Sequence, residues 1–336
     1  MRTASAGIKS YRSAHFGRLA VTVIAALGML AAISACGMNL RSAVQATPAA
    51  GASSAATASA SAATIPVGSS THAISVGGLS RSYIVYRPAT LPAAAPLVVM
   101  LHGGFGSASQ AEKSYGWNTE ADSGHFLVAY PDGYDRAWNA GGGCCGNPAK
   151  DGIDDIAFIT AMVSVIEHSV GVNADAVFAT GMSNGGIMDY DLACHTSIFA
   201  AIGPDSATEL GGCPDPAKLS VIAIHGTADK NIPYNGGEGD GVAHIDGPAI
   251  PALNASWRLA EDCAAPAVST AGTVTTSLAS CPDGRAVELI SIAGAGHQWP
   301  GSPSNPILEK LLGTDPPSTT LAATQVIWQF FAAHTR

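Results

Sequence analysis

Short apolar runs, separated by glycine, proline and polar segments, recur along the chain from about residue 83 onward. The first, residues 83–86, has side chains of alternating type and predicts an early antiparallel strand. The later runs are continuous, which is typical of strands that are buried on both faces of a parallel sheet. These expected strands comprise residues 96–101, 126–130, 176–180, 199–203, 219–225 and 287–293.

Three segments between or after these runs are predicted to be helical. Residues 154–168 carry apolar side chains at helical spacing, residues 184–195 follow the 176–180 strand, and residues 321–334 close the chain. Strands that alternate with helices predict an α/β protein with a doubly wound, mostly parallel sheet and helices on both faces. Ligands of such folds bind beyond the carboxyl ends of the strands.

The N-terminal segment does not share this pattern. Residues 1–18 contain four basic and no acidic residues, and an apolar run follows from residue 19 to 33, which together predict a secretory signal. The run ends in Ile33-Ser34-Ala35-Cys36, which resembles the lipobox of bacterial lipoproteins. That resemblance implies cleavage after residue 35 and a lipid on the Cys36 thiol, which would anchor the protein to the outer face of the cell membrane. A plain signal peptide with a chance cysteine is the alternative.

Residues 36–65 are rich in Ala, Ser and Thr and nearly free of charge. Such a segment cannot bury enough apolar surface to offset its chain entropy, so it is predicted to be a disordered tether. Residues 66–336 then form one α/β domain. After removal of residues 1–35, 12 Lys and Arg remain against 25 Asp and Glu, a formal charge of −13. With no basic cluster in this part, nucleic acid is not an expected partner.

The strongest candidate for chemistry is Ser183, within Gly181-Met182-Ser183-Asn184-Gly185. This G-x-S-x-G motif lies between the 176–180 strand and the predicted helix that follows it. Glycines on both sides of a serine permit a sharp strand-to-helix turn that presents the hydroxyl outward. Ser183 is therefore the expected nucleophile, and an ordinary serine at a helix start is the alternative.

A serine nucleophile needs a base and an acid that orients the base. His297 follows the last expected strand and lies in a glycine-rich loop, so it is the expected base. Asp229 follows the 219–225 strand, which gives the chain order serine, aspartate, histidine that is typical of this motif. Asp205, after the preceding strand, is the competing acid.

A tetrahedral intermediate needs amide donors for its oxyanion. The backbone N–H of Asn184, next to the nucleophile, is one expected donor. The other is expected from the loop after His102-Gly103, at Gly104 or, as the alternative, at Phe105. No residue pattern calls for a metal or a cofactor. The adjacent pair of acids at 154–155 is interpreted as helix N-terminal charge that favours the helix dipole.

Seven cysteines occur in the chain, and six remain if Cys36 is lipidated: Cys144, Cys145, Cys194, Cys213, Cys263 and Cys281. An even number in an exported protein predicts disulfides, although six cysteines allow fifteen pairings. Proximity favours Cys194–Cys213 and Cys263–Cys281. The adjacent Cys144 and Cys145 are left over. Surrounding glycines permit a turn that could join them. The Cα atoms of neighbouring residues, however, lie closer together than the separation of about 4.4 Å or more that is usual for a disulfide.

Six ordered motifs together resemble the polyhydroxybutyrate-depolymerase-like esterases, a family similar to the feruloyl and acetylxylan esterases of carbohydrate esterase family 1. These motifs are Leu101-His102-Gly103-Gly104, Trp138-Asn139-Ala140-Gly141 with Cys144-Cys145, residues 152–159, residues 181–186, residues 225–234 and residues 296–301. The resemblance implies an α/β-hydrolase fold and ester hydrolysis through an acyl-serine. It also implies Ser183, Asp229 and His297 as the triad, the Gly104 and Asn184 amides as the oxyanion hole, and the two local disulfides. Many members have cysteine where this chain has Gly104.

The substrate expected from this resemblance is a small or oligomeric ester, such as a feruloyl or acetyl ester of a plant polysaccharide or a hydroxyalkanoate oligomer. The resemblance places Trp299 in the substrate pocket, and Trp138 lies near the same predicted loops, where it either stacks on substrate or packs in the core. Two alternatives remain at this point: an acyltransferase of the cell envelope on the same fold, and a non-catalytic lipoprotein.

Overall fold

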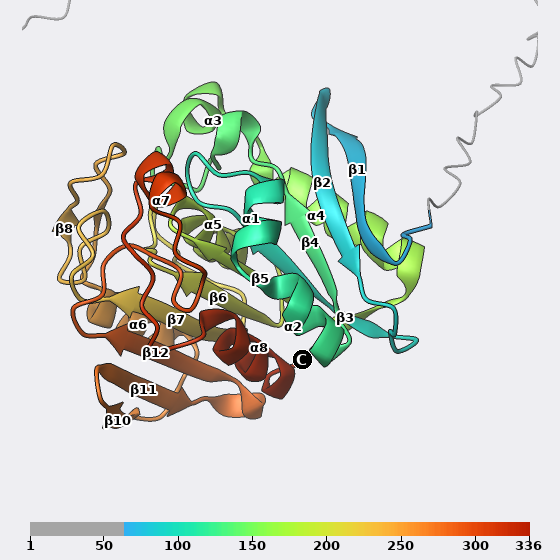
Figure 1. The fold of residues 1–336 in the computed structure, drawn as a ribbon. Coiled ribbons are helices and arrows are strands. Elements are labelled where there is room, and N and C mark those ends of the chain that lie inside the picture. The colour runs from blue at the N-terminus through green and yellow to red at the C-terminus, as the bar shows by residue number, and fades with distance from the viewer. Residues whose placement is uncertain (1–63) are drawn as a thin grey trace, which may run out of the picture. The chain divides into compact units, whose positions relative to one another are not determined.

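A ten-stranded sheet runs through the part of the chain that the computed structural model describes, residues 64–336 (Figure 1). The predicted signal, Cys36 and nearly all of the 36–65 tether lie outside the described residues. Six neighbouring strands of the sheet are parallel. In spatial order they are β4 (Leu127–Pro131), β3 (Ala95–Leu101), β5 (Val172–Met182), β6 (Ala201–Asp205), β7 (Ser220–Gly226) and β12 (Ala286–Ile292).

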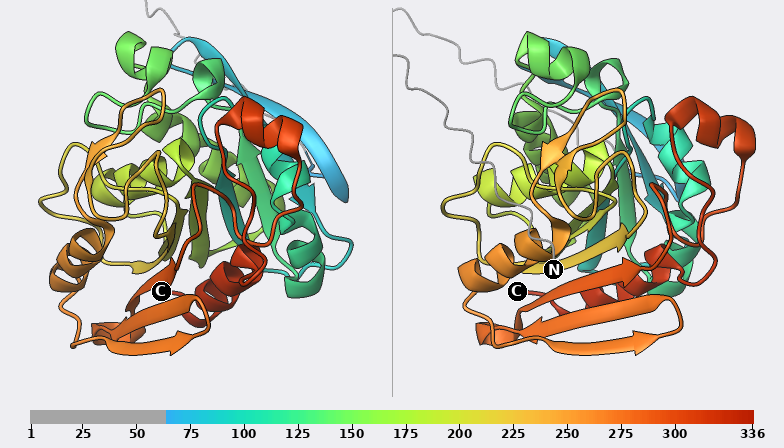
Figure 2. Two further views of the ribbon diagram at one scale, coloured as in Figure 1. Left: turned by 60° about the vertical axis from the view of Figure 1, so that its left-hand side comes forward. Right: turned by 90° about the vertical axis from the view of Figure 1, so that its left-hand side faces the viewer.

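Antiparallel strands extend the parallel centre on both sides. The hairpin of β1 (Gly68–Val76) and β2 (Leu79–Arg87) pairs with β4, and β11 (Val274–Ser280) with β10 (Ala267–Ala271) pairs with β12. Figure 2 shows these two hairpins at opposite ends of the sheet. A separate short pair joins β8 (Gly237–Glu238) and β9 (Asp246–Gly247). The doubly wound, mostly parallel sheet expected from the sequence is thus confirmed.

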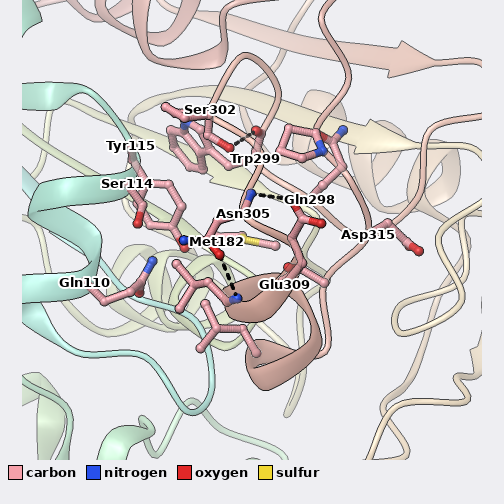
Figure 3. A pocket seen from close by; sticks show the side chains of 15 residues that line it. Gln110, Ser114, Tyr115, Met182, Gln298, Trp299, Ser302, Asn305, Glu309 and Asp315 are labelled. Carbon is pink, nitrogen blue, oxygen red and sulfur yellow. Dashed lines mark hydrogen bonds between the residues drawn. The ribbon is translucent and has the colours of Figure 1, made fainter.

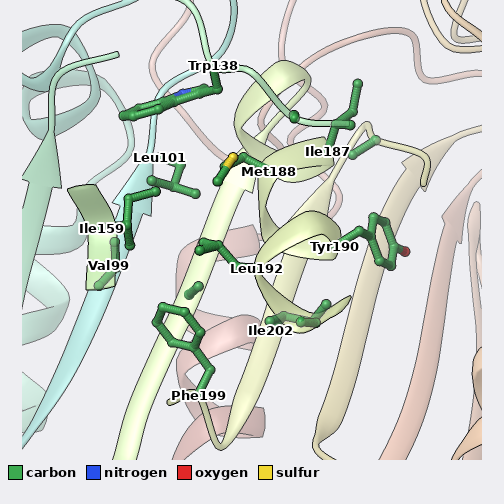
Figure 4. Packing of buried hydrophobic residues seen from close by; sticks show 14 of the residues in the cluster. Val99, Leu101, Trp138, Ile159, Ile187, Met188, Tyr190, Leu192, Phe199 and Ile202 are labelled. Carbon is green, nitrogen blue, oxygen red and sulfur yellow. The ribbon is translucent and has the colours of Figure 1, made fainter. Parts of the chain in front are cut away.

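Helices cover the two faces of the sheet and enclose two hydrophobic cores. One core contains side chains of α4 (Asp155–Val170), α5 (Asn184–His195) and α6 (Ile250–Ala260), and part of it is seen in Figure 4. The other contains side chains of α1 (Ala108–Ser114), α2 (Trp117–Gly124) and α8 (Ala323–Ala333). Side chains alternate between the two faces of a strand. In β3, for example, Val99 enters the first core and Val98 the second.

The order of the strands creates a switch point next to β3. The chain passes from β3 to β4 on one side and then returns to β5 on the other side of β3. The connections therefore leave the carboxyl ends of β3 and β5 in opposite directions, and this is where open α/β sheets bind ligands. The loop that begins with His102 follows β3, and Ser183 follows β5, so both predicted site segments begin at this point.

A buried ion pair fastens the β1–β2 edge to the loops near the site. Arg81 Nη2 of β2 lies 2.7 Å from Asp155 Oδ1 and also donates to the Asp132 carbonyl at 3.1 Å. The other carboxylate oxygen of Asp155 accepts from the Asn139 amide at 2.8 Å. Of the acidic pair read as helix N-terminal charge, only Asp154 caps the helix, where it accepts from Ala157 N at 2.8 Å. Asp155 lies in the first turn of α4, as expected for N-terminal charge, and is also the counterion of Arg81.

All expected strands and the three expected helices are present, whereas several elements were not anticipated. The edge strands β1, β10 and β11 carry many Ser and Thr residues and lie half-buried or exposed, so they lack an apolar run. The helices α1, α2, α3 (Gly146–Asp151) and α7 (Pro306–Leu312) have only six to eight residues. Two 3₁₀ turns, Tyr134–Arg136 and Pro282–Gly284, complete the fold. Within residues 64–336, no helix has the length and apolar character needed to cross a bilayer.

Candidate active site

Ser183 occupies the sharp turn between β5 and α5. Its backbone has φ of 56° and ψ of −122°, a conformation that non-glycine residues rarely adopt. Its N–H donates to the Asp205 carbonyl at 2.9 Å, which ties the turn to the end of β6. Strain of this kind persists only where the surroundings enforce it, and it is often found at functional positions.

The glycines around Ser183 are required by close packing. A Cβ at Gly185 would collide with the carbonyl oxygens of Leu101 and His102 at the end of β3. A Cβ at Gly181 would lie 2.5 Å from the Gly185 carbonyl carbon. The N-terminus of α5 therefore approaches the end of β3 more closely than any larger residue permits, and the serine turn lies against the β3 loop.

His297 and Asp229 form a buried hydrogen-bonded pair. His297 Nδ1 lies 2.8 Å from Asp229 Oδ2, and both side chains are almost completely buried. Asp229 Oδ1 accepts from the amides of Asn231 and Ile232 at 2.8 and 2.9 Å, so the carboxylate orientation is fixed. Burial raises the pKa of Asp229, but the His297 hydrogen bond and charge, with smaller contributions from His225 and the Ile232 amide, outweigh it and leave the pKa below its usual value.

Asp315 fixes the backbone on which His297 stands. The His297 amide donates to Asp315 Oδ2 at 2.7 Å, and the Asp315 amide donates to the His297 carbonyl at 2.7 Å. A Cβ at Gly296 would collide with the Asp315 carboxylate, so glycine is needed there. Sequence reasoning missed Asp315, because no strand end or motif precedes it.

The competing acid, Asp205, lies at the end of β6 but does not reach the histidine. Its side chain is completely buried and makes no hydrogen bond to His297 within the described part of the chain. Burial raises its pKa well above the usual value. A second histidine, His225, does approach Asp229: its Nε2 lies 3.4 Å from Oδ2 and donates to the Ile232 carbonyl at 2.9 Å. Burial lowers the pKa of His225, which keeps this ring neutral.

Two backbone amides next to Ser183 are free to bind an oxyanion. Within residues 64–336, no protein acceptor is found for the Gly104 amide or for the Asn184 amide, the first in α5. The alternative donor, Phe105, is excluded because its amide donates to the Arg136 carbonyl at 2.8 Å. The two amides without an acceptor in this part of the chain are therefore those of Gly104 and Asn184, the positions at which the sequence predicts oxyanion donors.

The Asn184 side chain and Trp138 connect the serine turn to the β3 loop. Asn184 Oδ1 accepts from the Trp138 amide at 2.7 Å, and Nδ2 donates to the Trp138 carbonyl at 3.1 Å. The Trp138 indole donates to the His102 carbonyl at 2.8 Å and is completely buried (Figure 4). The prediction that Trp138 contacts substrate is therefore wrong: the ring packs in the core and positions the loop.

Ser183 and His297 line one small cavity together with Gly103, Gly104, Gly106, Gln110, Tyr115, Met182, Leu312 and Thr314. The hydrogen bonds among residues 64–336 do not include one between Ser183 and His297; such contacts often tighten only when substrate binds. A larger cavity adjoins it, and Figure 3 shows Tyr115, Met182 and Trp299 on its wall. Trp299 is thus at the cavity, where its ring lies 4.9 Å from that of Tyr115.

The six cysteines are all paired. Disulfides join Cys194 to Cys213 and Cys263 to Cys281, which are the two pairings that proximity favoured. The third joins the adjacent Cys144 and Cys145, the pairing that the sequence left open. The only cluster of potential metal ligands found among the described residues consists of Cys194, Glu209 and Cys213. Both of its sulfurs belong to a disulfide, so this cluster offers no thiolate ligand.

Comparisons with known proteins agree with the geometry. Residues 81–251 match the family described as Esterase PHB depolymerase. NocK of Nocardia uniformis subsp. tsuyamanensis, named as an esterase, is 32% identical over 260 residues, which cover 67% of this chain and 72% of NocK. Feruloyl esterase B of Piromyces equi is 30% identical over 221 residues, which cover 61% of this chain and only 40% of that protein.

A solved structure supports the fold. The acetyl xylan esterase from Aspergillus awamori superposes with a TM-score of 0.54 at 15% sequence identity, and the match covers 73% of this chain and 99% of that one. At this level of identity the likeness concerns the fold alone. Together with the sheet order, it confirms the α/β-hydrolase fold.

The lowered pKa of Asp229 predicts a pH-dependent contribution to stability. A carboxyl group whose pKa is depressed by folding stabilises the folded state above its unfolded pKa of about 3.9 and loses this effect as the pH falls through the folded value. We expect Asp229→Asn to lower the free energy of unfolding most at pH 5–6 and less toward pH 3. Urea unfolding followed by tryptophan fluorescence measures the difference, with the exposed Asp175→Asn as control. A gap that stays constant down to pH 3 would contradict the prediction.

Proposed function

Because this chain belongs to the Esterase PHB depolymerase family and is a carboxylic-ester hydrolase, we propose that it cleaves esters through an acyl intermediate on Ser183. The observation that carries this proposal is the 2.8 Å bond between Asp229 and His297 beside a strained serine in the same cavity. In this proposal His297 is the general base, Asp229 orients it, and the amides of Gly104 and Asn184 bind the oxyanion.

The first half of the reaction forms the acyl-enzyme. His297 Nε2 takes the Ser183 proton as Oγ attacks the ester carbonyl, while Asp229 holds Nδ1–H and stabilises the imidazolium. The negative charge on the carbonyl oxygen is stabilised by the two amides, each worth about 2.7–4 kcal/mol in comparable enzymes. His297 then protonates the leaving alcohol. In the second half, His297 activates a water molecule that releases the acid.

The proposed substrates are small or oligomeric esters, with feruloyl and acetyl esters of polysaccharides and hydroxyalkanoate oligomers as the leading classes. One relative and the family description support this range: the Piromyces protein is named as a feruloyl esterase, and the family description names PHB depolymerase. The aromatic wall formed by Tyr115 and Trp299 beside the Ser183 cavity offers stacking surface for a planar acyl group.

We further propose that the enzyme acts outside the cell on a lipid tether. The basic start of the chain, the apolar run of residues 19–33 and Cys36 support export and lipidation. The three disulfides support an oxidising compartment, because disulfides rarely persist in a reducing one. Membrane contact in this proposal is made through the lipid.

Ser183→Ala is expected to lower kcat for p-nitrophenyl butyrate by about 10³-fold or more, because it removes the hydroxyl group that forms the proposed acyl intermediate. The same variant should lose labelling by a fluorophosphonate probe. Thermal unfolding serves as the control for folding. Turnover at the level of the native enzyme in a folded Ser183→Ala variant would sink the proposed mechanism.

Asn184→Ala is expected to lower kcat by roughly 10- to 100-fold with a smaller change in KM. The amide donor remains in this variant, but the two side-chain bonds that hold it against Trp138 are lost. Asn254→Ala is a matched control, since Asn254 is also a buried, hydrogen-bonded asparagine but lies on α6. We expect the control to affect stability and not kcat. Equal kcat values for native enzyme and Asn184→Ala would refute this role.

Cys36→Ala is expected to abolish labelling by an alkyne-bearing fatty acid in cells and to move the protein from the membrane pellet to the medium. Covalent attachment needs the thiol, and one acyl chain contributes about 0.8 kcal/mol of membrane affinity per buried methylene group. Ser42→Ala, a few residues along the chain, should behave as the native protein does. Persistent labelling of the Cys36→Ala variant would show that lipid is carried elsewhere.

A further inference from the structure

The short helix α1 holds Gln110 at the edge of the cavity that contains Ser183. The N-terminus of α1 is fixed by two bonds: Ser107 Oγ accepts from the Gln110 amide at 3.1 Å, and Asp132 Oδ1 accepts from the Ala108 amide at 2.7 Å. Ala108 and Ala111 are buried beneath the helix. The backbone of Gln110 is therefore held rigidly, and its side chain extends toward Tyr115 and Met182 (Figure 3).

The carboxamide of Gln110 is buried without a well-formed hydrogen bond to the protein. Neither Oε1 nor Nε2 meets hydrogen-bond geometry with any residue of the described chain, although both atoms are shielded from solvent. The side chain does lie close enough to the Tyr115 hydroxyl to oppose the rise of the Tyr115 pKa that burial causes. A buried polar group of this kind costs free energy unless a ligand or water satisfies it. Other polar side chains of the same wall are already engaged. Gln298 Oε1 accepts from Ser318 N at 2.9 Å, and Glu309 Oε1 accepts from Asn305 N at 2.8 Å.

Gln110 lies at the boundary between the cavity of Ser183 and the larger adjoining cavity. It lines both the cavity of Ser183 and His297 and the adjoining cavity of Tyr115 and Trp299. A Cβ at Gly106 would lie 2.9 Å from Gln110 Oε1, which places this oxygen over the turn that supplies the Gly104 amide. The carboxamide therefore lies on the same cavity as Ser183 and beside the turn that carries the proposed oxyanion donor, without being one of the reacting groups.

We propose that Gln110 is a specificity-determining residue that hydrogen-bonds a hydroxyl group on the acyl chain of the ester. A carboxamide offers both a donor and an acceptor, and a hydroxyl uses both. The neighbouring Tyr115 hydroxyl donates to Met182 Sδ at 3.6 Å, and burial raises its pKa to about 12, so it adds a second neutral polar group to the same wall. The proposal rests on the proposed function of Ser183.

The acyl half of the ester is the half that passes Gln110. The leaving alcohol must lie on the side of His297, because His297 protonates it. The acyl carbonyl must point its oxygen at the Gly104 and Asn184 amides. Gln110 is fixed over the same turn as Gly104, so the carbons next to the carbonyl run beside the carboxamide. In the proposed pose, a hydroxyl one or two carbons from the carbonyl faces this side chain.

The test compares two esters that differ by one hydroxyl group, p-nitrophenyl 3-hydroxybutyrate and p-nitrophenyl butyrate. The readout is kcat/KM for the 3-hydroxybutyrate ester divided by kcat/KM for the butyrate ester. The two esters differ in intrinsic reactivity, but this difference is the same for every variant and cancels when the ratios of two variants are compared. Gln110→Leu should lower this ratio by roughly three- to tenfold, the range set by one neutral hydrogen bond. Gln110→Ala should lower it in the same direction, although it changes the cavity volume in the opposite sense from Leu.

Ser114→Ala is the matched control, because Ser114 lies on the same helix and lines the same larger cavity. Its ratio should stay within about twofold of the native value. A ratio that is unchanged in a folded Gln110 variant, with both esters affected equally, would overturn the proposal and leave a purely structural role. The proposed function would fail separately, by full activity of Ser183→Ala on both esters.

Discussion

The close approach of α5 to the end of β3 is the constraint on which the site depends. Gly185 lies against the carbonyl oxygens of Leu101 and His102, where no Cβ fits. This contact sets the turn at Ser183 and places the first amide of α5 beside the β3 loop, where Gly104 supplies the second free amide. Because the contact is between backbones, the geometry of the proposed nucleophile and of the proposed oxyanion donors is preorganised before substrate arrives.

A polar network outside the reacting groups keeps this arrangement rigid. The His102 ring accepts from the Gly133 amide through Nε2, and Nδ1 donates to the Gly103 carbonyl. Burial lowers the pKa of His102 to about 4, so the ring stays neutral and can do both. Trp138 then links the His102 carbonyl to the Asn184 side chain. The histidine of the Leu-His-Gly-Gly motif is therefore structural in this chain.

Environment distinguishes the two acids that follow neighbouring strands. Asp229 accepts two backbone amides and the His297 imidazole, which favours its ionised form. Asp205 is equally buried but its carboxyl group lacks such donors, and its pKa is raised. One carboxylate can thus orient a histidine, while burial disfavours the charged form of the other. Both acids follow a strand end, so position does not distinguish them. The difference is that hydrogen-bond donors surround the Asp229 carboxylate.

The sequence alone determined the sheet and the placement of Ser183, Asp229 and His297 after strand ends, and it predicted amide donors at Asn184 and at Gly104 or Phe105. These follow from apolar runs, glycine spacing and chain order, which are local properties. Tertiary structure showed that Asp229, the expected acid, reaches His297 and that Asp205 does not. It alone decided that the Gly104 amide and not the Phe105 amide is free, that Trp138 packs in the core, and that Asp315 and Gln110 converge on the cavity. Those roles depend on contacts between residues far apart in the chain, and residue type carries no record of such contacts.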